Sequence, residues 1–366
     1  MFAQELEVCG LGSVCYALRC CQNCGLVLQD PAVSPRTMQR QYAMFSNYLA
    51  FHDGAPPLSP TAGRMLDLVS RALPTAGRVY DVGAAAGFML WHFRARGWTI
   101  GGCDPSPAAV AQAEARYGIE LDIGSCEHTL RNHAGLDLVT MSHVLEHIYD
   151  PTSVLQAVRT ALADGGHLLI EVPCLTAPER NGPGLFMMEH LNYFEATSLK
   201  NLLEAAGFEV LQETITLDYF PFPVITILAR RADLIVPSAP ANAFGDNLLF
   251  LQRYDQIETE QWRVIDSRLG TALAEGEEVF VWGAGLHTSA LLSRTGIERR
   301  AKILAITDRD SQKHGYTLGP YTIVEPAAAL QSGRKIVISS HVSERAIAAG
   351  LLDDGVASER IVRLYG

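Results

Sequence analysis

The pattern of apolar and polar residues along the chain predicts two successive α/β units joined by a long helix. Short apolar runs typical of buried strands alternate with amphipathic segments at helical spacing between residues 61 and 210. The same alternation returns after residue 277, and residues 247–273 carry apolar side chains at helical spacing. Because strands that alternate with helices pair in parallel, we expect mostly parallel sheets with ligands at the carboxyl ends of their strands.

Changes in composition divide the chain into four predicted segments. Residues 1–60 are rich in cysteine and contain an amphipathic stretch at 36–50, which either packs on the next domain or forms a lid. The main α/β domain follows at residues 61–230. Residues 231–270 are a linker that includes most of the long helix, and residues 271–366 form a second, smaller domain.

Residues 79–87, Val-Tyr-Asp-Val-Gly-Ala-Ala-Ala-Gly, predict a buried strand that passes through a tight turn into a helix. Small residues let a ligand approach the backbone there, because Gly adopts positive φ and has no side chain to clash. The pattern is not the dinucleotide fingerprint G-x-G-x-x-G, since Ala85 and Phe88 replace its second and third glycines. The next predicted strand ends at Asp104, about 20 residues further on, where a carboxylate can reach the hydroxyls of a ribose. Alternatively, Asp104 caps the helix that follows Pro105, or it serves both purposes.

A second strand, glycine turn and helix surround Gly283 and Gly285, and the following strand again ends in an acid, Asp308. This repeat predicts a Rossmann-like fold for residues 271–366. Thr288 replaces the third glycine of the fingerprint, so two interpretations stay open: the helix N-terminus holds a nucleotide, or the domain is a docking module without a ligand. A nicotinamide cofactor bound at this turn would make the chain an oxidoreductase.

The cysteines are concentrated at the start of the chain. In a reducing compartment such clustering indicates a metal site more than disulfides. Two thiolates two residues apart, Cys21 and Cys24, can grip one Zn²⁺, with Cys9 and Cys15 the nearest candidates for the other two ligands. The alternative is a degenerate ribbon in which the cysteines are buried small residues. Five of the eight cysteines lie in the first 24 residues: Cys9, Cys15, Cys20, Cys21 and Cys24.

Four features resemble, in order and spacing, the class I S-adenosylmethionine (SAM)-dependent methyltransferases over residues 61–230: Asp81-x-Gly83-x-x-x-Gly87, Asp104, Leu145-Glu146-His147 and Asp164-Gly165-Gly166. The resemblance implies that Asp81 and Gly83 lie by the methionine part of the cofactor, that Asp104 binds its ribose, and that residues 123–126 lie near adenine. Ala85 stands where the family more often has a glycine, and we expect this methyl group to alter the fit only slightly. The implied cofactor-binding residues are Asp81, Gly83, Ala85, Gly87, Asp104, Pro105, Ser125 and His143.

Residues 184–194 follow the fifth predicted strand and carry an adjacent Glu189 and His190, then Tyr193. Histidine is the commonest general base near neutral pH, and a neighbouring carboxylate raises its basicity. The alternative is that this segment only holds the connection to the next helix. The order of the three parts also resembles the sugar C-methyltransferases of deoxysugar pathways, whose Glu-His-x-x-Tyr-Phe motif is matched here, although Met187 replaces their preceding tyrosine.

That resemblance implies methyl transfer to carbon on a nucleotide-activated keto-sugar, with His190 as the base assisted by Glu189, and with Tyr193 and His147 as further proton donors. An O-methyltransferase acting on a hydroxyl would keep the same scaffold. A binding protein with a retired active site would bind the cofactor without turnover.

Charge and composition narrow the partners. The formal charge of −11 disfavours nucleic acid and anionic membranes as the main partner. No run of about 18 apolar residues occurs, and the first residues lack the features of a signal peptide, so we expect a cytoplasmic protein with no membrane partner.

Overall fold

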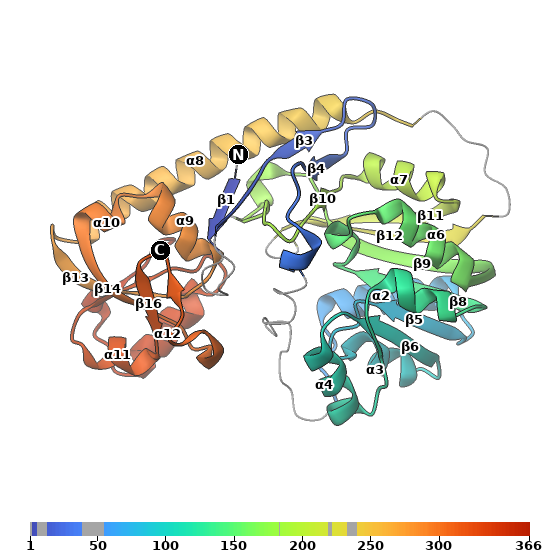
Figure 1. The fold of residues 1–366 in the computed structure, drawn as a ribbon, viewed down its shortest axis with the longest axis horizontal. Coiled ribbons are helices and arrows are strands. Elements are labelled where there is room, and N and C mark those ends of the chain that lie inside the picture. The colour runs from blue at the N-terminus through green and yellow to red at the C-terminus, as the bar shows by residue number, and fades with distance from the viewer. Residues whose placement is uncertain (1, 6–12, 39–54, 183, 219–221, 233–239) are drawn as a thin grey trace. The chain divides into compact units, whose positions relative to one another are not determined.

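The computed structural model describes six ranges of the chain, which group into two compact units (Figure 1). The larger unit comprises Leu18–Ala177 and Glu189–Leu249, and the smaller unit comprises Met1–Ala17, Pro178–Met188 and Phe250–Gly366. Most of the amphipathic stretch predicted at residues 36–50 lies outside the described residues, so both of its predicted roles, packing on the next domain or forming a lid, stay predictions. The described residues are 2–5, 13–38, 55–182, 184–218, 222–232 and 240–366.

A seven-stranded sheet forms the centre of the larger unit, in the order β11-β12-β9-β8-β5-β6-β7. The five strands from β9 to β7 are parallel, and the β11–β12 hairpin closes the sheet in antiparallel pairing. The predicted mostly parallel sheet is therefore confirmed. The strands are β5 (Arg78–Val82), β6 (Thr99–Asp104), β7 (Asp122–Ile123), β8 (Leu136–Ser142), β9 (Leu162–Pro173), β11 (Phe208–Thr216) and β12 (Val224–Arg231).

Helices cover both faces of this sheet. Successive residues of its central strands point to opposite sides, and these residues are apolar on both sides, so both faces must be buried. Along β8, Val139 and Met141 join a buried cluster with α6, whereas Leu138 joins a second cluster with α2, α3 and α4. The helices of the larger unit are α2 (Pro60–Ala72), α3 (Phe88–Arg94), α4 (Pro107–Tyr117), α5 (Cys126–Thr129), α6 (Pro151–Ala161) and α7 (Ala196–Ala205).

The starts of α2, α4 and α6 share a sequence signature, a short polar cap followed by proline. Ser59, Ser106 and Asp150 each accept a hydrogen bond from a backbone N–H in the first turn. The sequence Asp164-Gly165-Gly166 predicts that the helix beginning at Pro151 ends there, before a strand at His167. This prediction is wrong, since α6 ends at Ala161 and Leu162 already opens β9. Leu162 is buried and pairs with Leu136 of the neighbouring strand, and burial in the sheet outweighs continuation of the helix.

A small three-stranded sheet, in the order β10-β4-β3, also belongs to the larger unit. It consists of β3 (Leu18–Cys20), β4 (Val27–Gln29) and β10 (Asn192–Tyr193), so it joins the cysteine turn to the segment that follows residue 184. Gln29 Nε2 donates a hydrogen bond to the carbonyl of His190 at 2.7 Å. This pairing fixes the backbone at His190.

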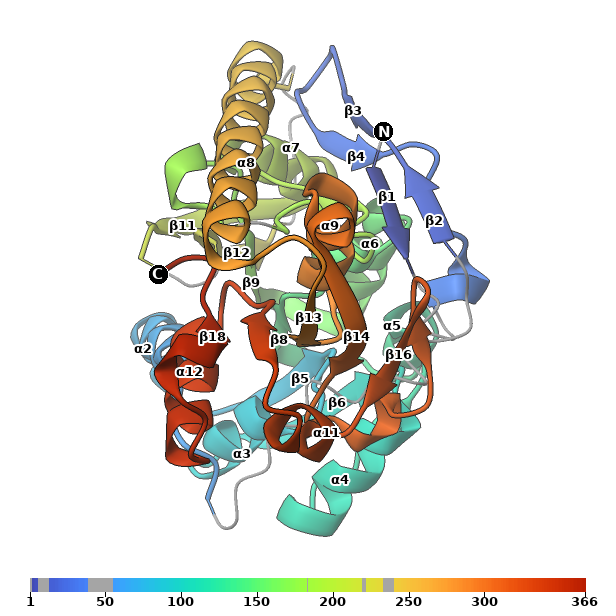
Figure 2. The same cartoon turned by 90° about the vertical axis from the view of Figure 1, so that its left-hand side faces the viewer.

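The smaller unit contains a six-stranded sheet in the order β15-β16-β14-β13-β17-β18 (Figure 2). All of its strand pairs are parallel except β15–β16. A separate antiparallel pair is formed by β1 (Phe2–Glu5) and β2 (Ser13–Tyr16). The sheet strands are β13 (Glu277–Trp282), β14 (Ala301–Thr307), β15 (Thr317–Leu318), β16 (Tyr321–Val324), β17 (Lys335–Ile338) and β18 (Ile361–Val362).

The predicted long helix is α8, Phe244–Ala272. None of the helices in the described ranges combines the length and apolar character needed to cross a bilayer. The remaining helices of the smaller unit are α9 (Leu286–Arg294), α10 (Ile297–Arg300), α11 (Pro326–Gln331) and α12 (Glu344–Asp353).

Candidate functional site

The turn between β5 and α3 is held by hydrogen bonds from its own backbone. Gly83 and Ala84 donate N–H bonds to the carbonyl of Cys103, at 2.9 and 3.0 Å. Gly83 has φ of 71°, and a Cβ atom at this position would lie 2.5 Å from Cγ2 of Val144. Both the backbone angle and the close approach require glycine at residue 83.

Asp104 supports the turn from the end of the neighbouring strand β6. Its Oδ2 accepts the N–H of Ala85 at 2.9 Å, and its Oδ1 accepts the N–H of Ser106 at 2.8 Å. Ser106, not Asp104, is the residue that caps α4, so the alternative in which Asp104 itself caps that helix is wrong. Burial raises the pKa of Asp104. The side chain is therefore a buried carboxyl that braces the turn.

Asp81 lies in the middle of the sheet, at the end of β5. Its side chain is buried and accepts a hydrogen bond from Thr140 Oγ1 at 2.5 Å. Burial, with a smaller contribution from the negative charge of Asp104, raises the pKa of Asp81 to about 7. Two buried acids beside a turn of small residues fit a cofactor that carries a positive charge and a ribose.

The end of β8 brings His143 and Val144 to the same edge of the sheet. His143 has φ of 54°, an uncommon angle for a residue with a side chain. Its Nδ1 lies 3.5 Å from Glu146 Oε1, and its Nε2 lies 3.7 Å from Glu171 Oε1. Burial opposes protonation, but these two carboxylates outweigh it and raise the pKa of His143. This side chain is held between two acids next to the turn.

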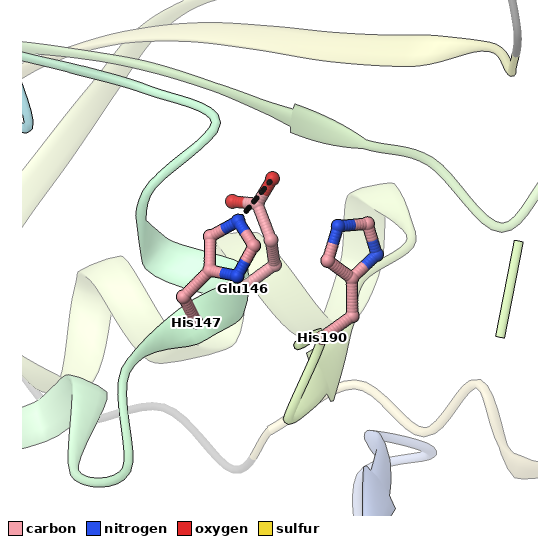
Figure 3. A group of neighbouring side chains, drawn as sticks. All are labelled: Glu146, His147 and His190. Carbon is pink, nitrogen blue, oxygen red and sulfur yellow. Dashed lines mark ion pairs between the residues drawn. The ribbon is translucent and has the colours of Figure 1, made fainter. Parts of the chain in front are cut away.

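Glu146, His147 and His190 converge on one point (Figure 3). Glu146 and His147 belong to the short helical turn Leu145–His147, whereas His190 precedes β10. The carbonyl of Glu189 accepts a hydrogen bond from His147 Nδ1 at 2.8 Å, and the two imidazole rings are 4.9 Å apart. Three histidines surround Glu146; burial opposes its ionisation, but these imidazoles outweigh it and lower its pKa to about 2.

Two further aromatic rings border the same cluster. The ring of Tyr193 lies 6.0 Å from that of His190, and the ring of Phe222 lies 6.3 Å away. Four predicted catalytic residues, Glu189, His190, Tyr193 and His147, are thus brought together. Sequence reasoning left Glu146 out of the site, although an acid directly before His147 at the end of a buried strand was the signal.

The remaining predicted cofactor residues lie around Asp104. Pro105 follows it on the surface, and Gly124 donates its N–H to the carbonyl of Asp104 at 3.1 Å. Ser125 begins α5, and its Oγ lies 3.0 Å from His128 Nδ1. Gly87, with φ of 79°, closes the turn at the start of α3. Residues 123–125 therefore lie beside the acid that the resemblance places at the ribose.

The predicted zinc ligands are described only in part. Cys21 and Cys24 lie in the partly exposed turn between β3 and β4, and Cys20 Sγ lies 3.4 Å from the carbonyl of Gly25. Cys9 lies outside the described residues, and the side chain of Cys15 is not described. The four-cysteine site stays a prediction.

The smaller unit carries the second glycine turn. Gly283 donates its N–H to the carbonyl of Thr307 at 2.7 Å, and Ala284 donates to Asp308 Oδ2 at 2.7 Å. Lys313 Nζ also donates to this oxygen, at 3.2 Å. The acid of this turn is therefore paired with a cation inside the smaller unit.

Comparisons with known proteins agree with the geometry of the larger unit. A family model described as a methyltransferase domain matches residues 59–213. The ubiquinone biosynthesis O-methyltransferase of Aeromonas salmonicida is 33% identical over 179 residues, 43% of this chain and 73% of that protein. Its namesake from Marinobacter nauticus is 31% identical over 204 residues, 49% of this chain and 83% of that protein.

A solved 1,6-didemethyltoxoflavin-N1-methyltransferase from Burkholderia thailandensis is similar with a TM-score of 0.44 and 16% identity, over 57% of this chain and 96% of that one. On the sequence matches, this chain belongs to the SAM-dependent methyltransferases. The predicted enzyme class and the SAM cofactor are confirmed.

Proposed function

We propose that this methyltransferase transfers the methyl group to the carbon atom next to the ketone of a nucleotide-activated sugar. The order of parts supports the proposal: a cysteine turn, a methyltransferase domain and a second α/β domain of Rossmann-like type. So does the sequence Glu189-His190-Leu191-Asn192-Tyr193-Phe194, which matches all four fixed positions of the Glu-His-x-x-Tyr-Phe motif of the sugar C-methyltransferases.

The observation that carries the proposal is the position of the Glu189–His190 pair. Val144 touches the cofactor turn at Gly83, and two residues later Glu146 begins the cluster that contains His190. SAM supplies a methyl group that is already activated, so the enzyme must mainly hold the acceptor in line with it and remove a proton from the acceptor. The group that removes this proton must therefore lie beside the methyl donor. The Glu189–His190 pair would take the proton next to the ketone, and Tyr193 and His147 would donate hydrogen bonds to the enolate oxygen.

We assign the cofactor to the turn after β5. Asp81 would face its positive charge, Gly83 and Gly87 would let it approach the backbone, and Asp104 would bind the ribose hydroxyls. Ser125 and His143 would border the adenine and methionine ends. The cysteine turn would bind Zn²⁺ through Cys21 and Cys24 with two further thiolates, which zinc analysis of the purified chain would test.

Methylation of a hydroxyl group on a small molecule is the second candidate. It is favoured by the curated relatives, which are named as O-methyltransferases of ubiquinone biosynthesis. The same base would then remove a hydroxyl proton, and no carbon-bound proton would be exchanged.

An incubation in D₂O separates the two candidates. The protein is incubated with a panel of nucleotide-activated keto-sugars, once with SAM and once with S-adenosylhomocysteine. The sugars are then analysed by mass spectrometry. We expect a gain of one methyl group on carbon in the first and deuterium incorporation next to the ketone in the second. His190→Gln should abolish both, whereas His133→Gln, at a partly exposed histidine paired with Asp122, should change neither.

Methylation of a hydroxyl without deuterium incorporation would overturn the assignment to carbon and leave the O-methyltransferase. Full activity of the His190→Gln enzyme would overturn the role of the Glu189–His190 pair.

A further inference from the structure

Glu146 is a buried carboxylate whose hydrogen-bonding capacity is not met by the described residues. It is 1% exposed, and neither of its oxygens accepts a hydrogen bond from the part of the chain that the structure describes. Oε1 lies 3.5 Å from His143 Nδ1 and 3.9 Å from His147 Nε2. These separations are too long for hydrogen bonds. An ionised carboxylate in such a place needs a cation.

The orientation of His147 indicates which kind of cation fits. A carbonyl oxygen can only accept, so the contact of 2.8 Å to Glu189 places a proton on His147 Nδ1. In the neutral imidazole the lone pair is then on Nε2, which is the atom that faces Glu146 Oε1. A metal-binding histidine usually donates its other ring N–H to a backbone carbonyl or a carboxylate, which fixes its tautomer and the orientation of its ring, and His147 makes such a bond.

His190 supplies a third donor from a different segment. One ligand atom each of Glu146, His147 and His190 lies within 4.8 Å of the others (Figure 3). Two ligands of one Zn²⁺ lie about 3.3 Å apart in tetrahedral geometry, so an inward shift of about 1 Å would bring these atoms to bonding positions. Two histidines and one carboxylate leave a fourth position open, as catalytic zinc sites do.

We propose that Glu146, His147 and His190 bind a divalent transition-metal ion of the Zn²⁺ type. His143 is the competing partner of Glu146, but its ring also faces Glu171, and both His143 and His147 approach Oε1. Oε2 therefore stays available to an ion. The segment Leu145–His147 and the residue before β10 are both fixed by backbone bonds, since Leu191 donates its N–H to the carbonyl of Glu146 at 2.7 Å.

The ion gives the proposed function a Lewis acid, and this part of the inference rests on that function. The open position would bind the ketone oxygen of the acceptor. With His147 and His190 on the ion, the ion replaces the hydrogen bond from His147 at the enolate oxygen, and the Glu189 carboxylate is the member of the Glu189–His190 pair that takes the proton. The C–H electron pair forms the C=C bond, and the carbonyl π pair moves to the oxygen held by the ion. The resulting enolate carbon is the methyl acceptor.

Cobalt titration tests the site without any acceptor. The full chain is stripped with EDTA and titrated with Co²⁺, whose visible absorption reports imidazole and carboxylate ligands, whereas thiolate ligands add an intense near-ultraviolet band. We expect one equivalent of visible absorption, retained in the Cys21→Ser/Cys24→Ser variant. Glu146→Gln and His190→Gln should each weaken Co²⁺ binding by more than about 100-fold, since even outer partners of a metal contribute 10–100-fold.

His133→Gln serves as the matched control, because this partly exposed histidine pairs with Asp122 and is not a member of the cluster, and the variant should bind Co²⁺ like the unchanged chain. The two variants in the cluster lie in different segments, and SAM affinity measured on each shows whether it is folded. Absence of visible absorption at millimolar Co²⁺, or its retention in both cluster variants, would overturn the proposal. A bound ion with no methylation of any keto-sugar would instead contradict the proposed function and leave the metal site standing.

Discussion

The chain makes the same kind of turn twice, after β5 in the larger unit and after β13 in the smaller one. In each, a glycine with positive φ donates its N–H to a backbone carbonyl near the end of the neighbouring strand: Gly83 to Cys103, and Gly283 to Thr307. In each, an acid at the end of that neighbouring strand accepts the N–H of an alanine in the turn with one oxygen and a backbone N–H two residues further on with the other.

The surroundings of the two acids differ. Asp308 is paired with Lys313 at 3.2 Å, whereas among the described residues no ion pair reaches Asp104. Near the second turn, His287 Nδ1 lies 2.9 Å from Ser339 Oγ, and its Nε2 lies 2.6 Å from the hydroxyl of Tyr365. We therefore expect the nucleoside of the cofactor at the first turn, where the acid has no ion pair among the described residues.

The largest effect is expected from Gly83→Ala. Alanine at φ of 71° costs about 1–2 kcal/mol, and its Cβ would lie 2.5 Å from Val144. Overpacking of this kind adds about 1–3 kcal/mol, so SAM affinity should fall by more than about tenfold. Calorimetric titration with SAM measures it.

Gly285→Ala is the control in the second turn, because a Cβ at Gly285 has open space around it and the backbone angle is ordinary. It should leave SAM affinity unchanged. Unchanged SAM binding by Gly83→Ala would show that the contact with Val144 is easily relieved.

Replacing Asp104 and Asp308 in turn with asparagine compares the two turns directly. Both oxygens of Asp104 accept backbone N–H groups, and asparagine offers only one acceptor, so one N–H would face an NH₂ group. The cost is about 1–3 kcal/mol, which corresponds to roughly 10–100-fold weaker SAM binding. Asp308→Asn creates the same defect in the smaller unit and should leave SAM affinity unchanged. An equal loss in both variants would mean that the second turn also affects the cofactor.

SAM affinity measured at several pH values tests the role of Asp81. Its pKa is raised to about 7, so the carboxyl is largely protonated at pH 6 and ionised at pH 8. An ionised carboxylate attracts the positive charge of SAM, and affinity should rise several-fold, up to about tenfold, across this window. Binding measured at pH 6, 7 and 8 should become flat in Asp81→Asn.

Thr140→Val supplies a second check on the same titration. The Thr140 hydroxyl donates to Asp81 and favours its ionised form, so its loss should move the rise in affinity to higher pH. A rise that is unchanged in Asp81→Asn would assign the pH dependence to another group.

The fold of the larger unit could be predicted because its parallel strands are apolar runs and three of its helices, α2, α4 and α6, begin at Ser-Pro or Asp-Pro signals. The sheet of β3, β4 and β10 could not. It pairs Leu28 with Asn192, and no local pattern indicates a contact between residues so far apart. The end of α6 was missed for a similar reason, since Leu162 is drawn into the sheet by its partner Leu136.

In the candidate site, too, some residues could be predicted from local spacing, whereas others are brought together only by contacts between distant parts of the chain. Asp81, Gly83 and Asp104 follow from spacing alone, because they lie at the ends of two consecutive strands. The grouping of Glu146 with His190 depends on β10 pairing with β4 and on the bond from Leu191 to the Glu146 carbonyl. Sequence reasoning therefore grouped His190 with Glu189, Tyr193 and His147 and left out Glu146.

The smallest effect concerns Ala85, where the family more often has glycine. Ala85 has φ of 47°, which costs alanine about 1 kcal/mol and glycine nothing. Ala85→Gly also gives the unfolded chain more conformational freedom, which lowers the free energy of unfolding by about 0.4–1 kcal/mol. The relief of strain and this entropic cost nearly cancel, so the melting temperature should stay within a degree or two or rise slightly.

Ala86→Gly is the matched control for Ala85→Gly. Ala86 is fully buried against Ala109, and it is not among the residues with positive φ. This change loses the methyl contact and gains no relief of strain, so it should lower the melting temperature by several degrees. Equal destabilisation by both changes would mean that the methyl group of Ala85 is held by packing, and that the positive φ of the turn costs the protein little.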